Sequence, residues 1–279
     1  IFHSNIKVTK MSYDEADNLL AENADLSALK TAAEKHQKYR DQQGAISLNL
    51  PNVEVKFKDD LVTISKQNSS PSRDLIAEMM VLAGRVIAQF SQQNEIVMPY
   101  AIQDAGDFPA ETLEAKNQLT LAQAFKAMKY FKRSATSVKP LLHYGLGLSA
   151  YLRITSPLRR YFDLLAHQQL SNFILGKPTL EREKVKQIIG ITNTSMADIG
   201  KTVRSSNDHY KCLFLLQNPQ WQGAGVVVDL RGDKALFMLP ELGMMTQIKF
   251  KNLPDLDAEI LLKISSVDLP QRLANFQPA

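Results

Sequence analysis

"YLRITSPLRRYFDLLAHQQL", residues Tyr151–Leu170, contains the clearest helix start in the chain. Ser156 predicts an N-cap and Pro157 the first helical position, because proline leaves no N–H unpaired there and its φ is already helical. Arg159 and Arg160 would then lie in the first turn, where the positive end of the helix dipole favours acidic side chains. Two cations at that position indicate that a negative group binds beside them.

A phosphate group suits this position well. The start of a helix supplies unpaired backbone N–H donors, and the planar guanidinium of arginine binds two phosphate oxygens at once. The alternative is an internal ion pair, because Arg159 and Asp163 are four residues apart and side chains at that spacing meet on a helix surface. The spacing alone leaves both interpretations open.

The composition is that of a soluble globular protein. The chain has 279 residues, of which 44% are hydrophobic and 22% charged, and this length suggests one large domain and one small one. Its 33 Lys and Arg against 29 Asp and Glu give a net charge of +4, which permits a polyanionic partner without requiring one. The single cysteine, Cys212, excludes an intrachain disulfide and predicts a reducing compartment, which we interpret as the cytoplasm.

No segment of the sequence predicts insertion into a membrane. The longest apolar run, residues 75–90, contains Glu78 and Arg85, so we expect neither a membrane span nor a membrane partner. A signal-peptide pattern is missing as well, and the sequence begins with Ile1 instead of methionine. We therefore expect a piece of a longer polypeptide.

The first part of the chain carries helix patterns on both sides of a strand region. Ser12 and Glu15 form a capping-box pattern before one helix, and a second helix ends at Gly44. Period-two alternation predicts a three-stranded antiparallel meander from residues 45–50, 53–57 and 62–66. The next helix, over residues 72–92, carries an apolar stripe of Leu75, Met79, Leu82, Val86 and Phe90.

The remaining chain predicts further helices and then a β-domain. Thr120 caps a helix whose basic side, Lys126, Lys129 and Arg133, is either a solvated face or a nucleic-acid contact. A long helix covers residues 180–217, and after Pro219 five short strands predict a small OB-type barrel. The predicted fold class is α+β, with long helices and an antiparallel sheet in residues 1–217 and the barrel in residues 220–279.

The residues alone provide no set of groups that would perform hydrolysis. The acidic pairs lie in turn-like contexts, and the five histidines lack the spacing of zinc ligands. Neither a glycine-rich phosphate loop nor a G-x-S-x-G motif is present. Composition and spacing therefore predict an anion-binding site without its own chemistry.

The stretch Ser134–Leu170 closely resembles the signature of RNB-domain exoribonucleases, the ribonuclease II and ribonuclease R family. That signature runs H-x-G-L, then Y, then T-S-P-[IL]-R-[RK]-Y-x-D and a following H. The matching residues are His143, Gly145, Leu146, Tyr151, Thr155, Ser156, Pro157, Leu158, Arg159, Arg160, Tyr161, Asp163 and His167. Residues 75–90 resemble the family's E-x-M-x-x-A-N helix, and the terminal β-region is similar to its RNA-binding barrel, so the resemblance covers nearly the whole chain.

The resemblance implies a magnesium-dependent hydrolytic enzyme that degrades single-stranded RNA from its 3′ end to 5′-nucleotides. It implies that Arg159 is catalytic and contacts the phosphate near the scissile bond. The RNA-binding positions that it implies are Arg160, Thr155, Ser156, Arg153, Tyr151, Glu78 and His143. The magnesium-binding aspartates of the family belong upstream of this segment, so we expect no metal ligands here. The expected partners are single-stranded RNA and the N-terminal portion of the same enzyme, which we expect to be a monomer.

Four positions depart from the family pattern. Gly84 replaces an asparagine, Arg153 a histidine, Gln168 an arginine and Val203 a glutamate. The added cation at Arg153 would strengthen phosphate binding. An alternative to the enzyme is an inactive RNB homologue that binds RNA or a protein. Two further choices are open: whether the barrel binds RNA or protein, and whether Glu78 contacts RNA or pairs with Arg85.

Overall fold

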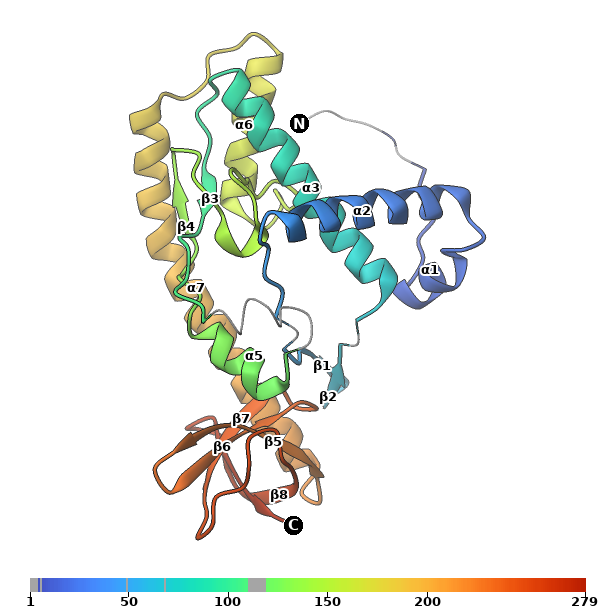
Figure 1. The fold of residues 1–279 in the computed structure, drawn as a ribbon, viewed down its shortest axis with the longest axis vertical. Coiled ribbons are helices and arrows are strands. Elements are labelled where there is room, and N and C mark those ends of the chain that lie inside the picture. The colour runs from blue at the N-terminus through green and yellow to red at the C-terminus, as the bar shows by residue number, and fades with distance from the viewer. Residues whose placement is uncertain (1–4, 6, 49, 68, 110–118) are drawn as a thin grey trace. The chain divides into compact units, whose positions relative to one another are not determined.

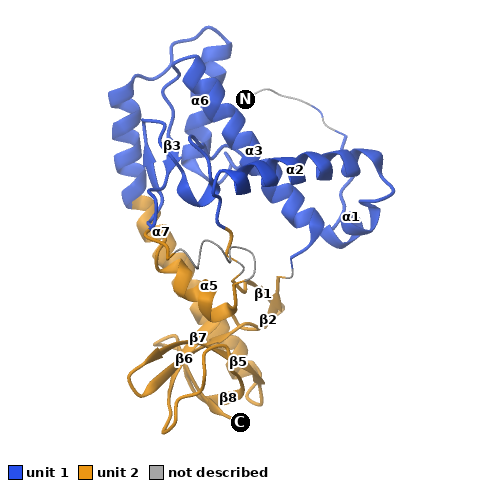
Figure 2. Ribbon diagram, in the orientation of Figure 1, with its two compact units in different colours: residues 1–46, 69–106, 132–194 blue, residues 47–68, 107–131, 195–279 orange. Residues whose placement is uncertain are grey.

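The computed structural model describes residues 5, 7–48, 50–67, 69–109 and 119–279. The chain divides into two compact units (Figure 2). Unit 1 comprises Ile1–Ile46, Ser69–Gly106 and Lys132–Thr194, and unit 2 comprises Ser47–Asn68, Asp107–Phe131 and Ser195–Ala279. Each unit thus gathers three segments that are separated in the sequence.

Unit 1 is mainly helical, and α2 lies across α3 within it (Figure 1). Its helices are α1 (Tyr13–Leu19), α2 (Ala24–Gln42), α3 (Pro71–Gln93), α6 (Tyr161–Ile174) and the first part of α7 (Arg182–Gln217). Strand β3 (Tyr100–Ile102) pairs antiparallel with β4 (Ala135–Ser137), and a 3-10 turn, η1, spans Tyr144–Leu146. The capping box of Ser12 and Glu15 is confirmed, and Gly44 follows α2 with φ +87°.

The core of unit 1 packs α3 and α6 against two extended segments between them. Its fully or nearly buried residues are Ala88, Ile96, Met98, Tyr100, Ala150, Leu152, Ile154 and Ala166. An isolated bridge joins Tyr100 to Leu152, and Leu152 N–H also donates to the Gly84 carbonyl of α3. The segment 150–154 therefore lies directly against α3, next to the motif that ends in α6.

The predicted apolar stripe of α3 is confirmed except at Val86, which is 50% exposed. Leu75 is buried, and Met79 and Phe90 pack against buried clusters. The buried face of α3 also carries Ser72, Glu78, Gly84, Ala88 and Ser91. Segment 150–154 approaches the α3 backbone closely at Gly84, so a side chain at that position has no space. Close packing therefore explains why small residues occur on this buried face.

Unit 2 begins with a hairpin in place of the predicted three-stranded meander. Strands β1 (Val53–Lys58) and β2 (Leu61–Lys66) pair antiparallel through a turn at Asp59 and Asp60, both of which have positive φ. The described residues of 45–50 form no strand. Ala45 and Ile46 there donate their N–H groups to Arg40 and Gly145 carbonyls, so their backbone groups are not available for a ladder.

The predicted C-terminal barrel is confirmed as a nearly closed five-stranded barrel. Its strands are β5 (Gln222–Arg231), β6 (Lys234–Leu239), β7 (Met244–Lys249), β8 (Glu259–Asp268) and β9 (Leu273–Pro278). The order is β7-β6-β5-β8-β9, and β7 lies next to β9. Leu215, near the end of α7, packs into the barrel core with Phe237 and Leu262.

Helix α5 (Leu121–Met128) packs on this barrel through Phe125. Thr120 caps α5 as predicted, and its hydroxyl also donates to Asp257. Lys129, from the predicted basic stripe, lies 2.9 Å from the carboxylate of Asp229. That hydrogen bond is the main cause that lowers the pKa of Asp229, so Lys129 is engaged within the protein. None of the described helices combines the length and the apolar character needed to cross a membrane.

Candidate functional site

Residues Thr155–Arg160 form a turn before α6, which we call the arginine turn. The N–H groups of Arg159 and Arg160 both donate to the Ser156 carbonyl, at 3.2 and 3.0 Å. Arg160 is extended, with φ −127° and ψ 118°, and is the N-cap of α6 without a side-chain cap bond. The predicted helix start at Ser156 and Pro157 is therefore wrong, since α6 begins at Tyr161. Both arginines precede the helix, and Asp163 occupies its first turn, where the dipole favours an acid.

Asp163 is the negative group beside Arg160. Its side chain is fully buried, and its Oδ2 atom accepts from the Ser156 N–H at 2.8 Å and from the Arg160 Nη2 at 2.7 Å. Arg160 Nε donates to the same oxygen at 3.1 Å. The predicted internal pair of the motif thus exists, but it joins Asp163 to Arg160 and not to Arg159. One buried carboxylate fixes the first residues of the turn to the helix that follows.

Arg159 remains available to a ligand. Arg159 is exposed, and its side chain has no hydrogen bond or ion pair with any residue that the structure describes. Arg153 likewise has no such partner in the described part of the chain. Thr155 accepts only a long bond, 3.4 Å, from Arg160. The segment therefore carries two arginines without a partner among the described residues, Arg153 and Arg159, and a third, Arg160, that Asp163 holds in place.

Tyr151 is half-buried near several charged groups of the segment. Burial raises the pKa of its hydroxyl, and the charges of Arg153, Arg160, Asp163 and Arg40 act on it in turn. Groups whose charges act on one hydroxyl lie near it, because Coulomb interactions weaken with distance. Of the predicted arginines, Arg153 and Arg160 therefore lie near Tyr151, whereas Arg159 is not among the charges that act on it.

His143 packs edge-on against the Tyr151 ring, with 5.6 Å between the ring centroids. Burial, and next the charge of Arg153, lower the pKa of His143 to about 4. The ring is therefore neutral at pH 7, and its Nδ1 is buried without a partner among the described residues. His143 contributes a neutral ring to the site and adds no positive charge for a phosphate.

Gly84 explains how the Tyr151 ring fits against α3. A Cβ atom added at Gly84 would overlap the Leu152 carbonyl oxygen and the Tyr151 ring. The departure from the family asparagine therefore has a structural consequence, since a side chain here would occupy the volume of the tyrosine ring. Gly84 is a residue on which the position of Tyr151 depends.

We expect Gly84→Ala to destabilise the chain by up to about 2 kcal/mol, because overpacking costs about 1–3 kcal/mol and the gain in helix propensity returns about 1 kcal/mol. Urea unfolding followed by circular dichroism measures the change. Gly190→Ala in α7 is the matched control, since nothing lies within 4 Å of its added Cβ. The control should gain stability, and an equal gain in Gly84→Ala would contradict the close packing.

Glu78 is 7% exposed, and its carboxylate is bonded within the protein. Its carboxylate accepts from Arg40 Nε at 2.8 Å and lies 2.6 Å from His36 Nδ1. Burial lowers the pKa of His36, so at neutral pH its ring is uncharged and Nδ1–H is the donor. Arg85 lies over the Tyr39 ring, 3.9 Å from its centroid, so the alternative pairing of Glu78 with Arg85 is wrong. No sequence pattern pointed to Arg40 or His36, which come from α2.

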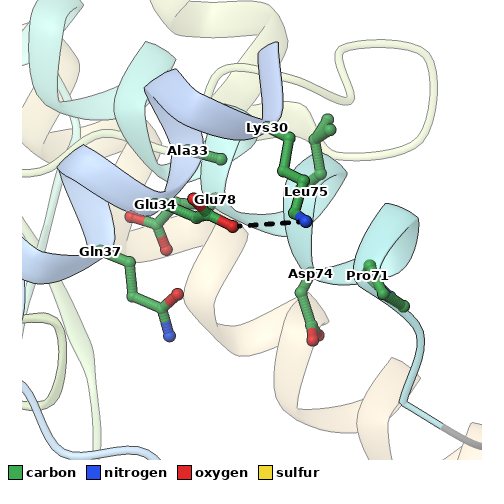
Figure 3. Close-up of a pocket in the computed structure, with 8 residues that line it drawn as sticks. All are labelled: Lys30, Ala33, Glu34, Gln37, Pro71, Asp74, Leu75 and Glu78. Carbon is green, nitrogen blue, oxygen red and sulfur yellow. Dashed lines mark ion pairs between the residues drawn. The ribbon is translucent and has the colours of Figure 1, made fainter. Parts of the chain in front are cut away.

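A cavity of about 260 Å³ lies between α2 and α3 (Figure 3). Its lining residues are Lys30, Ala33, Glu34, Gln37, Pro71, Asp74, Leu75 and Glu78. Lys30 pairs with Glu34 at 3.7 Å, which leaves an excess of carboxylates around the space. An acidic lining repels phosphate groups, so this cavity is distinct from the cationic site at the arginine turn.

In the part of the chain that the structure describes, no three His, Cys, Asp or Glu side chains are grouped so as to hold a metal ion. Divalent ions in hydrolytic sites need several carboxylates at close range. The residues of this site therefore suit an anion and do not fit magnesium by themselves.

The family model of the RNB domain matches residues 1–176. The chain belongs to the RNB family. An uncharacterized ribonuclease of Synechocystis sp. is 30% identical to this RNB chain over 269 residues, which cover 93% of the chain and 40% of that protein. The chain thus spans about two fifths of the length of this relative.

Solved RNB structures share the fold. The Dss1 exoribonuclease of Candida glabrata, determined as an active-site mutant, superposes with a TM-score of 0.83 at 22% identity, covering 97% of this chain and 38% of that one. Mycoplasma genitalium RNase R in complex with ribose-methylated single-stranded RNA gives a TM-score of 0.76 at 20% identity, covering 96% and 53%. These likenesses establish a ribonuclease R-like fold over nearly all of the present chain.

Proposed function

We propose that this chain is part of a magnesium-dependent hydrolytic 3′→5′ exoribonuclease that degrades single-stranded RNA to 5′-nucleotides. The observation that carries the proposal is the exposed Arg159, which has no partner within the described part of the chain and precedes an Arg160 that Asp163 holds. Family membership supports the reaction class. The magnesium-binding aspartates would come from sequence upstream of this segment.

The chain's own residues would bind and orient the RNA backbone. Arg159 would donate two hydrogen bonds to phosphoryl oxygens and stabilise charge that develops there in the transition state. Arg153 and Arg160 would add positive charge, and Thr155, Ser156, Tyr151 and His143 would shape the surrounding contact. Glu78 would act through Arg40, to which it is bonded, and not by touching RNA. The described residues include no group of His, Cys, Asp or Glu side chains that could hold a magnesium ion, so they would act on the RNA alone.

The proposal includes the domain division and the partners. Residues 1–217 would form the C-terminal portion of an RNB domain, and residues 220–279 an RNA-binding OB-type barrel. The partners would be single-stranded RNA and the N-terminal portion of the same enzyme, acting as a monomer in the cytoplasm. The buried free thiol of Cys212 is compatible with a reducing compartment.

The test is digestion of a 5′-labelled single-stranded RNA with magnesium, comparing this chain alone with the chain joined to its upstream polypeptide. Stepwise shortening from the 3′ end by the joined protein only is the expected result. The proposal is abandoned if the joined protein leaves the RNA intact while it remains folded.

A second candidate function is an inactive RNB homologue that binds RNA or a protein. It is favoured by one observation, the lack of a metal-binding cluster among the described residues. In the same digestion, RNA binding without shortening by the joined protein would support this candidate. Four clustered aspartates in the upstream sequence would exclude it.

A further inference from the structure

Arg40, near the end of α2, makes bonds to two different elements of unit 1. Its Nε donates to Glu78 Oε1 at 2.8 Å and its Nη2 bonds the other oxygen, so the carboxylate on α3 is held by a two-pronged contact. Its Nη1 donates to the Leu146 carbonyl at 3.3 Å. The side chain is 13% exposed. One guanidinium therefore ties α2 to α3 and to the loop of residues 143–148.

The 143–148 loop is pinned against the end of α2 at several points. The Gly145 carbonyl of the loop accepts from the Ile46 N–H at 3.1 Å, and the preceding residue, Ala45, donates to the Arg40 carbonyl at the end of α2 at 2.9 Å. Gly147 has φ +63°, and a Cβ there would be 2.7 Å from the Arg40 carbonyl oxygen. The loop thus packs on Arg40 without space for a larger residue.

This loop carries His143, whose ring packs on Tyr151 at the centre of the proposed RNA site. The charge of Arg40 also acts on the Tyr151 hydroxyl. Arg40 is therefore connected to the site by a direct electrostatic effect and by the backbone of the loop that it bonds.

Burying an ion pair is a weak source of stability, because removing both charges from water costs about as much as their attraction returns. The Glu78 carboxylate nevertheless lies in a buried position between Arg40 and His36. A geometric role explains the arrangement, since arginine alone offers donors in a fixed plane that reach two elements at once.

We propose that Arg40, locked by Glu78, is a positioning residue that holds the 143–148 loop and Tyr151 in the geometry that binds RNA. This inference rests on the proposed function. Arg40 acts through these residues and makes no phosphate contact of its own, so its loss should weaken RNA binding without removing a charge that displaces counterions.

The experiment measures single-stranded RNA binding by this chain as a function of salt, together with thermal unfolding. The key variant is Arg40→Met with Glu78→Met, since replacing a buried ion pair by apolar residues of similar size often preserves stability. The matched control, Lys30→Met with Glu34→Met, removes an exposed pair from the same helix α2. Arg40→Lys keeps the charge but lacks the planar donors.

We expect Arg40→Met with Glu78→Met to unfold cooperatively and to bind RNA about tenfold more weakly, because small displacements of positioning contacts have effects of that order or more. The slope of log K against log[salt] should match wild type. Arg40→Lys should show a smaller loss with the same slope, and the control pair should bind as wild type. If the double variant does not unfold cooperatively, Arg40→Lys decides by its affinity, since wild-type affinity in this folded variant would overturn the positioning role.

Two results would overturn the positioning role while leaving the proposed function intact. One is wild-type affinity in the folded double variant, which would make the pair purely structural. The other is a slope that is less steep by about 0.7, the change for one lost phosphate contact on single-stranded nucleic acid, which would make Arg40 a direct phosphate ligand. If the wild-type chain is folded but binds no RNA, the measurement is repeated with the chain joined to its upstream polypeptide, and no binding there would reject the proposed function and this inference with it.

Discussion

Asp163→Ala should lower the melting temperature of this chain by roughly 5–10 °C. The substitution removes three bonds to one buried oxygen, from the Ser156 N–H and from two nitrogens of Arg160. Bonds to a buried charge are each worth about 1.5–3 kcal/mol, but Arg160 is 31% exposed and can regain water, so we expect a net loss of about 2–3 kcal/mol. For a chain of this size each kcal/mol shifts the melting temperature by about 2–4 °C.

The control is Asp198→Ala, which removes a carboxylate that is 74% exposed and lies 3.5 Å from Lys201. An exposed pair contributes little, so this variant should melt within about 2 °C of wild type. Both variants can be followed by circular dichroism. If Asp163→Ala also melted that close to wild type, the carboxylate would not be what fixes the arginine turn.

Arg159→Ala should weaken single-stranded RNA binding by about 10–100-fold while leaving stability unchanged. An arginine–phosphate contact is a charge-assisted hydrogen bond worth about 1.5–3 kcal/mol, and each lost phosphate contact makes the salt dependence less steep by about 0.7. Stability should hold because the side chain is exposed and has no partner among the described residues. In an enzyme that contains this chain, we expect a degradation rate lower by about 10²–10³.

Arg182→Ala is the matched control for this prediction. Arg182 is an exposed arginine of unit 1, at the start of α7 and outside the arginine turn, so its removal changes the net charge equally. Electrophoretic mobility shifts at several salt concentrations compare the two variants. Equal losses in both would point to a general charge effect, and degradation within twofold of wild type in Arg159→Ala would end its assignment as the catalytic arginine.

The two adjacent arginines of the motif differ in their partners. Arg160 is bonded to Asp163 and keeps the turn in shape, whereas Arg159 is exposed and has no partner among the described residues. The sequence offered both a phosphate and an internal carboxylate as the negative group. The structure contains the carboxylate at Arg160, and the phosphate at Arg159 remains the proposal.

The sequence by itself determined the features that depend on local order along the chain. The capping boxes at Ser12 and Thr120, the long helix α7 and the five strands of the barrel all follow from spacing within a few residues. The motif T-S-P-L-R-R-Y-x-D also identified the family from its own residues, because its spacing is long and specific. Each of these signals is complete within one segment.

Only the tertiary structure decided which side chains meet across segments. Helix α6 begins at Tyr161 and not at Pro157, and Asp163 in its first turn accepts hydrogen bonds from Ser156 and Arg160 of the preceding turn. On α3, the Tyr151 ring packs against Gly84. The pairing of Glu78 with Arg40 joins residues 38 apart on crossing helices. Such contacts depend on how separate elements pack, and packing is a property of shape that no local pattern encodes.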